Sequence, residues 1–317
     1  MCRGGYPVSA GRWTFMKKAI NQWCFPADWS WERVFSLMEE LRFDAVELAV
    51  DYVPFFEAMR AAPQEGLIAE IAKSVGSTFQ EGKSLTFDSP PVRIREIKKQ
   101  AADHGLAVST LLTISQFYSP LTSPDDAVWN QGVDLVSRLI DIAVELEAPN
   151  LLVVPGVVTS HVDYETAYNR LVDALWRLKD KAENSGVGLG IENIWGKILY
   201  SPLEMRALVD TFSSPSVGVH FDVGNVIQYG HPDQWIRILG GRILSVHLKD
   251  YDEGINNIRA FTHLFQGSVP WDRVMRALRD IGYDGYLIAE VPPYPFCPEE
   301  GIRDISRKMD ILMEGEY

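Results

Sequence analysis

The feature of the sequence that most constrains its fold is a regular alternation of short aliphatic runs with longer amphipathic stretches. The short runs predict β-strands at Lys18–Phe25, Ala45–Val50, Ala107–Ile114, Asn150–Pro155, Val187–Asn193, Val217–Val223, Ile243–Asp250 and Gly285–Val291. Between them, helical patterns occupy Trp31–Leu41, Pro91–His104, Asp125–Leu146, Tyr164–Asn184, Pro202–Thr211, Trp271–Asp280 and Cys297–Leu312. Strict alternation of this kind requires parallel strands joined by crossover helices. Eight such units in 317 residues predict one α/β domain, a closed (β/α)₈ barrel with a parallel eight-stranded core.

The barrel domain is expected to span residues 16–317. Residues 1–15 are polar and contain glycine, so we expect an N-terminal extension, disordered or loosely held, rather than part of the barrel. An open doubly wound sheet is the alternative fold, but no Gly-x-Gly-x-x-Gly follows the first strand. Residues 62–91 form a longer connection than usual and are expected to fold partly over the barrel mouth.

Charge and cysteine content narrow the classes of partner. Acidic residues outnumber basic ones by 43 to 30, which gives a formal net charge of −13 at pH 7. An acidic surface repels phosphate backbones, so nucleic acid is not an expected partner. No apolar run approaches the roughly 18–20 residues that cross a membrane. Three dispersed cysteines suit neither a disulfide framework nor a zinc ribbon, which favours a cytoplasmic protein.

Ionisable side chains near the C-terminal ends of the last four strands carry the strongest functional signal. Side chains alternate faces along a strand, and this alternation places Glu192, Asp222, His247 and Glu290 opposite the apolar faces of their strands. Three carboxylates that converge in a barrel mouth repel one another and lose solvation unless a cation joins them. Oxygen ligands with one imidazole suit a single divalent ion, Mn²⁺ in the first place, with Mg²⁺, Co²⁺ or Zn²⁺ as alternatives.

Five further residues near the strand ends are candidates for substrate binding. They are His220, Asn225, Lys249, Trp23 and Glu47. His220 and Lys249 share the inward faces of their strands, where packing inside the barrel or a structural ion pair are the alternatives. Asn225 would contact a substrate hydroxyl or cap a loop. Trp23 would flank a sugar ring or pack in the core, and Glu47 would bind substrate or pair with a lysine.

Four short motifs resemble those of the xylose-isomerase-like TIM barrel superfamily. They are Ile191-Glu-Asn193, His220-Phe-Asp-Val-Gly-Asn225, Val246-His-Leu-Lys-Asp250 and Gly282-Tyr-Asp-Gly-Tyr-Leu-Ile-Ala-Glu290. More narrowly, they resemble the sugar (phosphate) isomerase/epimerase branch, which includes ketose 3-epimerases. Each motif alone is weak, but the four occur in order on successive strands. The likeness covers nearly the whole chain, from Ala19-Ile-Asn-Gln-Trp23 and Phe43-Asp-Ala-Val-Glu-Leu48 to the last strand.

The resemblance implies a ligand set and a reaction. The implied metal ligands are Glu192, Asp222, His247 and Glu290. The implied reaction is 3-epimerisation of a ketose or ketose phosphate, in which the two glutamates also move protons. One glutamate would remove the proton beside the carbonyl, the metal would stabilise the cis-enediolate, and the other glutamate would return a proton to the opposite face. A metal-dependent dehydratase of the same superfamily and a non-catalytic sugar-binding barrel remain as alternatives, and analogy allows a homo-oligomer.

Two positions depart from the pattern of epimerases that act on free sugars. Those enzymes often carry a histidine where this chain has Asn225, and a substrate-binding glutamate where it has Ile198. The Asp-Val-Gly-Asn form is closer to pentulose-phosphate 3-epimerases. The sequence therefore disfavours a specificity like that of tagatose epimerases.

Overall fold

The computed structural model describes residues 16–53 and 84–315. The predicted extension at 1–15 and most of the long connection at 62–91 lie outside the described residues. Within them, eight parallel strands form a closed barrel, because the first strand pairs with both the second and the last. These strands are β1 (Lys17–Asn21), β2 (Ala45–Asp51), β4 (Ala107–Leu112), β5 (Asn150–Val153), β6 (Gly188–Glu192), β7 (Val217–Asp222), β8 (Ile243–Leu248) and β11 (Tyr286–Ala289). The predicted (β/α)₈ barrel is confirmed.

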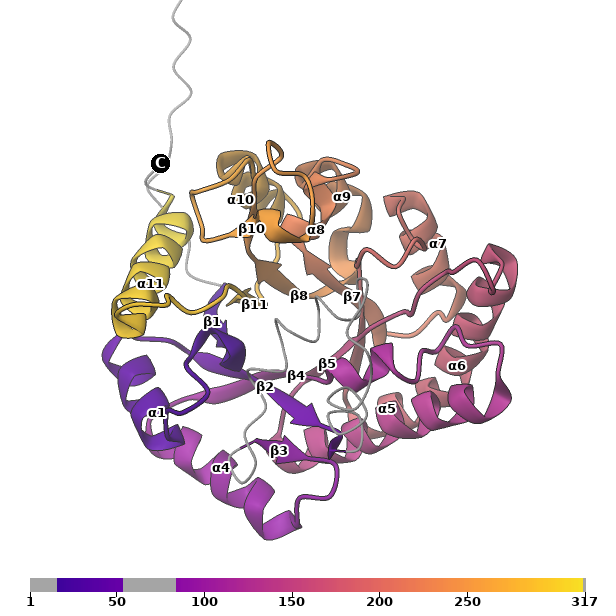
Figure 1. Cartoon of the computed structure of the whole chain (residues 1–317), viewed down its shortest axis with the longest axis horizontal. Helices are drawn as coiled ribbons and strands as arrows, with labels where there is room; N and C mark the ends of the chain where they lie inside the picture. The colour runs from indigo at the N-terminus through magenta and orange to yellow at the C-terminus, as the bar shows by residue number, and fades with distance from the viewer. Residues whose placement is uncertain (1–15, 54–83, 316–317) are drawn as a thin grey trace, which may run out of the picture.

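Helices surround the strands, as Figure 1 shows. The seven predicted helices are α1 (Trp31–Glu40), α4 (Pro91–Asp103), α5 (Asp126–Leu146), α6 (Tyr164–Ser185), α7 (Pro202–Thr211), α10 (Trp271–Asp280) and α11 (Pro298–Glu314). Two further helices that the sequence pattern did not reveal are α8 (Val223–Ile227) and α9 (Pro232–Leu239). None of the helices in the described ranges is long and apolar enough to cross a membrane.

Local capping explains where several helices begin. The Ser30 side chain accepts a hydrogen bond from the backbone N–H of Arg33 and caps α1. Helix α7 begins with proline at its first position, behind Ser201, whose hydroxyl accepts from the N–H of Leu203. Both arrangements satisfy backbone donors that have no partner inside the helix.

The alternation of side chains along the strands determines where the core and the site lie. The outward residues Val217, Val219 and Phe221 of β7 belong to the main hydrophobic core between barrel and helices. Inside the barrel, Ala19, Ala45 and Ile288 form a small buried cluster. Ile288 lies two residues before Glu290, so this cluster fills part of the barrel interior one step below the mouth.

The end of the first strand departs from the prediction. Strand β1 stops at Asn21, whose side-chain oxygen accepts from the N–H of Trp23 at 2.7 Å and caps the 3₁₀ turn η1 (Gln22–Cys24). The predicted strand to Phe25 is therefore too long. The alternation of faces cannot be applied to Trp23, because the side chain of Asn21 competes with the strand ladder for backbone donors.

The loop after β8 is attached to the barrel by one buried carboxylate. This loop contains the antiparallel pair β9 (Asp250–Tyr251) and β10 (Phe261–Thr262). Asp250 is fully buried, and its Oδ1 accepts from the backbone N–H groups of Tyr251 at 2.9 Å and Val269 at 3.0 Å. Its Oδ2 accepts from Trp271 Nε1 at 2.9 Å. Asp250 thereby joins the two ends of the loop at the start of α10.

Replacing Asp250 with alanine should leave three buried donors without an acceptor. We expect a loss of about 3–5 kcal/mol in the free energy of unfolding, as for a buried charged group removed from its partners. Urea denaturation monitored by circular dichroism measures this loss. The matched variant Glu253→Ala, at an exposed position of the same loop, should change stability by less than about 0.5 kcal/mol. Equal stability of the two variants would contradict the anchoring role.

Candidate metal centre

The four predicted ligands converge at the C-terminal end of the barrel. Glu192 and Asp222 are the last residues of β6 and β7, His247 lies one residue before the end of β8, and Glu290 directly follows β11. From His247 Nδ1, the distance is 3.3 Å to Glu290 Oε2, 3.7 Å to Asp222 Oδ2 and 3.9 Å to Glu192 Oε1. The sequence prediction that these four side chains point to one place agrees with this geometry.

The donor set fits a divalent cation. Ligand atoms bonded to one ion at roughly 2.1 Å lie about 3–3.5 Å apart, close to the spacing found around His247 Nδ1. Asp222 and His247 are fully buried, and Nδ1 has no hydrogen-bond partner among the described residues. An ion at the centre of the group would satisfy this nitrogen and offset the repulsion of the three carboxylates. Glu192, Asp222 and His247 offer ligand atoms that all lie within 4.8 Å of one another.

Glu47 contacts the imidazole of His247 at Nε2, the ring nitrogen that points away from the carboxylate cluster. Its Oε2 lies 2.7 Å from His247 Nε2 and also accepts from Asn21 Nδ2 at 2.7 Å. A carboxylate in this position keeps a proton on Nε2 and directs Nδ1 toward the cluster. Burial opposes the charged form of His247, but Glu47 and Glu290 outweigh burial and raise its pKa well above the usual value, so an ion bound at Nδ1 would displace a proton. Glu47 is fully buried, so this geometry favours an orienting role over substrate contact, and its partner is a histidine rather than the expected lysine.

Lys249 reaches into the cluster, as its place on the inward face predicted. Its Nζ lies 2.6 Å from Asp222 Oδ2 and 2.6 Å from Glu290 Oε2. Burial alone would lower the pKa of this ammonium group, but the attraction of Asp222, Glu290 and Glu192 outweighs burial and raises the pKa. Lys249 is therefore a fixed positive charge beside the candidate ligands.

The two glutamates have opposite electrostatic environments. Burial raises the pKa of Glu192 to about 8, and the neighbouring Asp222 and Glu290 add to this rise against the opposing effect of Lys249. Burial also acts to raise the pKa of Glu290, but Lys249 and His247 lower it well below its usual range. In the absence of a metal ion, a proton therefore binds more readily to Glu192 than to Glu290.

Asn225 and His220 lie on either side of the ligand layer. The N–H of Asn225 donates to Asp222 Oδ1 at 2.8 Å, which caps α8, and its Nδ2 donates to Glu192 Oε1 at 3.5 Å. Asn225 therefore both caps a helix and contacts a candidate ligand. His220 is fully buried behind His247, with the ring centroids 4.1 Å apart at 76°. Burial lowers its pKa well below the usual value, so the imidazole is neutral.

Trp23 belongs to an apolar wall that shares the inside of the barrel with the polar cluster. The wall is a compact group of side chains from β2, β4, β5 and the loops after β5 and β6: Ala49, Leu112, Leu152, Val154 and Ile194. Trp23 and Phe117 pack against this wall and remain partly exposed. The structure thus places Trp23 at the mouth of the barrel rather than in the main core.

Two residues that sequence reasoning missed hold the backbone of candidate ligands in place. Asn193 pairs with the main chain of Asp222: its Nδ2 donates to the carbonyl and its Oδ1 accepts from the N–H, both at 2.8 Å. The buried Cys24 thiol donates to the Ala289 carbonyl and accepts from the Val291 N–H, both at 3.3 Å, and so holds the backbone on both sides of the candidate ligand Glu290. Asn193 directly follows the candidate ligand Glu192 in the Ile-Glu-Asn motif, and this position could have indicated its role from the sequence. No sequence pattern indicates the role of Cys24.

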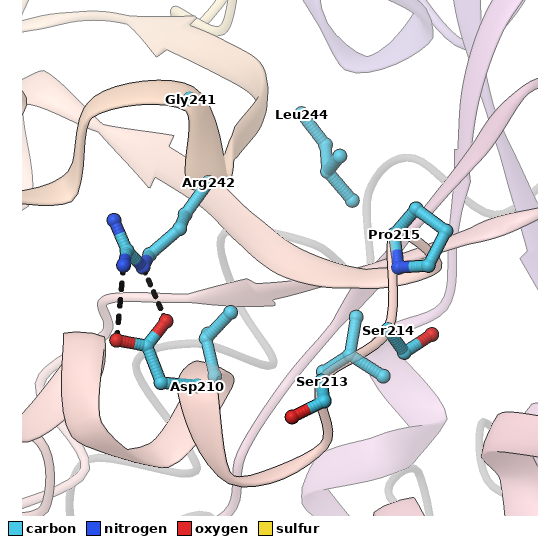
Figure 2. Close-up of a pocket in the computed structure, with 9 residues that line it drawn as sticks. Asp210, Ser213, Ser214, Pro215, Gly241, Arg242 and Leu244 are labelled. Atoms are coloured by element: carbon cyan, nitrogen blue, oxygen red, sulfur yellow. Dashed lines mark hydrogen bonds and ion pairs between the residues drawn. The ribbon is translucent and has the colours of Figure 1, made fainter.

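A cavity of about 400 Å³ lies at the opposite end of the barrel (Figure 2). It is lined by residues near the starts of β7 and β8, among them Val217 and Leu244. The guanidinium of Arg242 is already paired there with both oxygens of Asp210, at 2.5 Å and 2.9 Å. In (β/α)₈ enzymes the N-terminal face serves stability and the C-terminal face carries the chemistry. We therefore assign the functional site to the ligand cluster and not to this cavity.

A family model and several curated proteins are similar to this chain. The family model described as "Xylose isomerase-like TIM barrel" matches residues 35–312. The ketose 3-epimerase of Arthrobacter globiformis is 25% identical over 255 residues, which cover 78% of this chain and 83% of that protein. The L-ribulose-5-phosphate 3-epimerase UlaE of Salmonella typhi is 25% identical over 227 residues, 69% of this chain and 79% of the relative.

Solved structures show the same fold at lower identity. The IOLI protein with a bound zinc atom has a TM-score of 0.72 at 17% identity, covering 95% of this chain and 99% of its own. D-psicose 3-epimerase in the presence of D-fructose has a TM-score of 0.65 at 19% identity, covering 95% and 96%.

The contact between Glu47 and His247 generates a prediction about metal affinity. Glu47→Ala should weaken the binding of Mn²⁺ by about 10–100-fold, because His247 loses the acceptor that orients its ring. Glu47→Gln keeps an oxygen acceptor and should lose less. Isothermal titration of Mn²⁺ into metal-stripped protein measures both changes, with the exposed Glu165→Ala as a control that binds normally. Unchanged affinity in Glu47→Ala would rule out the orienting role.

Proposed function

This chain belongs to the xylose isomerase-like TIM barrel family, and we propose that it is a divalent-metal-dependent 3-epimerase of a ketose or ketose phosphate. One observation carries the proposal: Glu192 and Glu290 lie on either side of the buried Asp222 and His247, on strands that β7 and β8 separate. The names of the two curated relatives, a ketose 3-epimerase and an L-ribulose-5-phosphate 3-epimerase, support the reaction class.

The residues that would hold the metal are the four of the cluster. Glu192, Asp222, His247 and Glu290 offer three carboxylates and one imidazole, a mixed donor set that several divalent ions accept, and we propose Mn²⁺ in the first place. When bound, the ion supplies Lewis acidity toward a ketose carbonyl and the neighbouring hydroxyl, which acidifies the C–H bond between them.

The two glutamates are the members of the cluster that can reach a substrate. The side chains of Glu192 and Glu290 are 10% and 18% exposed, whereas those of Asp222 and His247 are fully buried. Inverting a carbon by proton transfer requires one group on each of its faces. We infer that one glutamate removes the proton from C3 and the other returns a proton to the opposite face. The two roles exchange when the reaction runs in reverse.

The rest of the mouth offers contacts for a sugar. Lys249 and Asn225 present an ammonium group and an amide beside the glutamates, and we propose that they bind substrate oxygens. Trp23, with the apolar wall behind it, would cover the carbon skeleton. Ile198 is only 1% exposed and belongs to the core, so it contributes no contact of the kind that a glutamate makes in free-sugar epimerases. Together with the resemblance of the Asp-Val-Gly-Asn form at residues 222–225 to pentulose-phosphate 3-epimerases, this leads us to favour a pentulose phosphate.

The cellular setting follows from the thiols and the charge. Cys24 and Cys297 are free, and a net charge of −13 disfavours nucleic acid as a partner. We propose a cytoplasmic enzyme with a small-molecule sugar substrate, in which a homo-oligomer would be compatible with a barrel of this kind.

The fate of the proton tests the reaction. In deuterium oxide, with a panel of pentuloses, hexuloses and their phosphates, NMR should show deuterium at C3 of the inverted ketose while the carbonyl stays at C2. Glu192→Gln and Glu290→Gln should each lower turnover by about 10²–10⁴-fold, because each variant lacks one proton-transfer group. The exposed Glu165→Gln should not.

Three results would contradict the proposal in different ways. A dehydration product without any epimer would favour the dehydratase alternative. An aldehyde at C1 would indicate an aldose–ketose isomerase. Near-normal turnover in either glutamine variant would exclude the two-glutamate mechanism.

A further inference from the structure

We propose that Lys249 is the internal counter-ion of the metal-free site, and that a bound divalent ion displaces its ammonium group from Asp222 and Glu290 toward the substrate. The inference rests on the metal centre of the proposed function and adds an order of events: the ion binds first, and the lysine becomes available to the substrate afterwards.

The lysine and the ion would use the same oxygens. Lys249 Nζ lies 2.6 Å from both Asp222 Oδ2 and Glu290 Oε2. These two oxygens are also the carboxylate atoms nearest to His247 Nδ1, at 3.7 Å and 3.3 Å. An ion bound by Nδ1 and these oxygens would lie roughly 2.1 Å from each of them. It could then be no more than about 4.7 Å from Nζ in its present position, the sum of two bonds to a shared oxygen.

Charge explains both why the lysine lies there and why it must move. Glu192, Asp222 and Glu290 carry three negative charges when ionised. Lys249 lies in direct contact with two of them, and the imidazole of His247 faces all three. In a buried site such a group of carboxylates is unfavourable without a counter-ion. A divalent ion supplies the missing positive charge at closer range, and it repels an ammonium group at this separation, because the buried surroundings screen poorly.

Phe261 gives the ammonium group of Lys249 a contact besides the two carboxylates. The stem runs directly against Gly224, where an added Cβ would lie 2.7 Å from Lys249 Cγ, so a glycine is needed for the stem to pass. The ring of Phe261 lies 4.9 Å from Nζ and is partly exposed. Phe261 in turn contacts Trp195, with ring centroids 5.0 Å apart. The ammonium group is therefore already within reach of an aromatic face, which can continue to hold it at the mouth when it moves away from the two oxygens.

The consequence is a site whose metal affinity is held down by its own lysine. Lys249→Met keeps an unbranched stem but removes the charge. We expect this variant to bind Mn²⁺ at least about tenfold more tightly than the unmodified protein, because no ammonium group competes for the oxygens. In metal-free form it should melt at a lower temperature than the unmodified protein, and saturating Mn²⁺ should remove that difference. Titration calorimetry on metal-stripped protein and melting curves with and without Mn²⁺ measure the two effects.

Two controls make the result specific. Lys197→Met removes a positive charge from an exposed position in the loop after β6 and should leave the affinity for Mn²⁺ unchanged. A crystal structure of the Mn²⁺-loaded unmodified protein should show Lys249 Nζ beyond hydrogen-bond distance from both Asp222 and Glu290. If the lysine stayed on both oxygens beside a bound ion, the displacement would be disproved even with tighter binding in the methionine variant.

The outcomes separate this inference from the proposed function. If the unmodified protein binds no Mn²⁺, the metal centre itself is wrong. If it binds Mn²⁺ and Lys249→Met binds equally or more weakly, only the counter-ion exchange is wrong. If Lys249→Met folds only in the presence of Mn²⁺, its affinity for Mn²⁺ can be measured from the loaded form by competition with a chelator. Lys249→Gln provides a second test, and we expect it to show the same gain in affinity for Mn²⁺.

Discussion

The rest of the structure depends on one energetically unfavourable arrangement, the burial of three carboxylates around a single imidazole nitrogen at the mouth of the barrel. Asp222 and His247 have no contact with solvent, and no hydrogen bond satisfies His247 Nδ1 among the described residues. A chain tolerates such a cluster only when a cation completes it. The ion pair made by Lys249 and the carboxylate behind His247 both follow from this requirement.

The barrel separates the parts that give stability from the parts that give chemistry. The outward faces of the strands and the helices form the main core, and a small cluster of alanine and isoleucine lies inside the barrel below the mouth. Nearer the mouth, an apolar wall shares the barrel interior with the ionisable cluster. Buried polar side chains, Asn193 and Cys24 among them, hold the backbone of the ligand-bearing strands by hydrogen bonds. Rigid support of this kind is what the proposed proton transfer would need.

Sequence reasoning succeeded where the direction of a side chain depends on its own strand alone. The alternation of faces along a strand is a local property, so the convergence of Glu192, Asp222, His247 and Glu290 could be predicted from four separate segments. It failed at Trp23, because the side chain of Asn21 ends the strand early. The contact of Glu47 with His247 spans 200 positions and exists only because the barrel closes. No pattern within either strand specifies it.

Metal analysis tests the central claim most directly. Protein purified without chelator should contain about one divalent ion per chain, and His247→Ala should lose nearly all of it, because the only nitrogen ligand of the cluster is gone. His231→Ala, at an exposed position, should keep the ion. Full occupancy in His247→Ala, or an unmodified protein that binds no divalent ion even when one is supplied, would contradict the account.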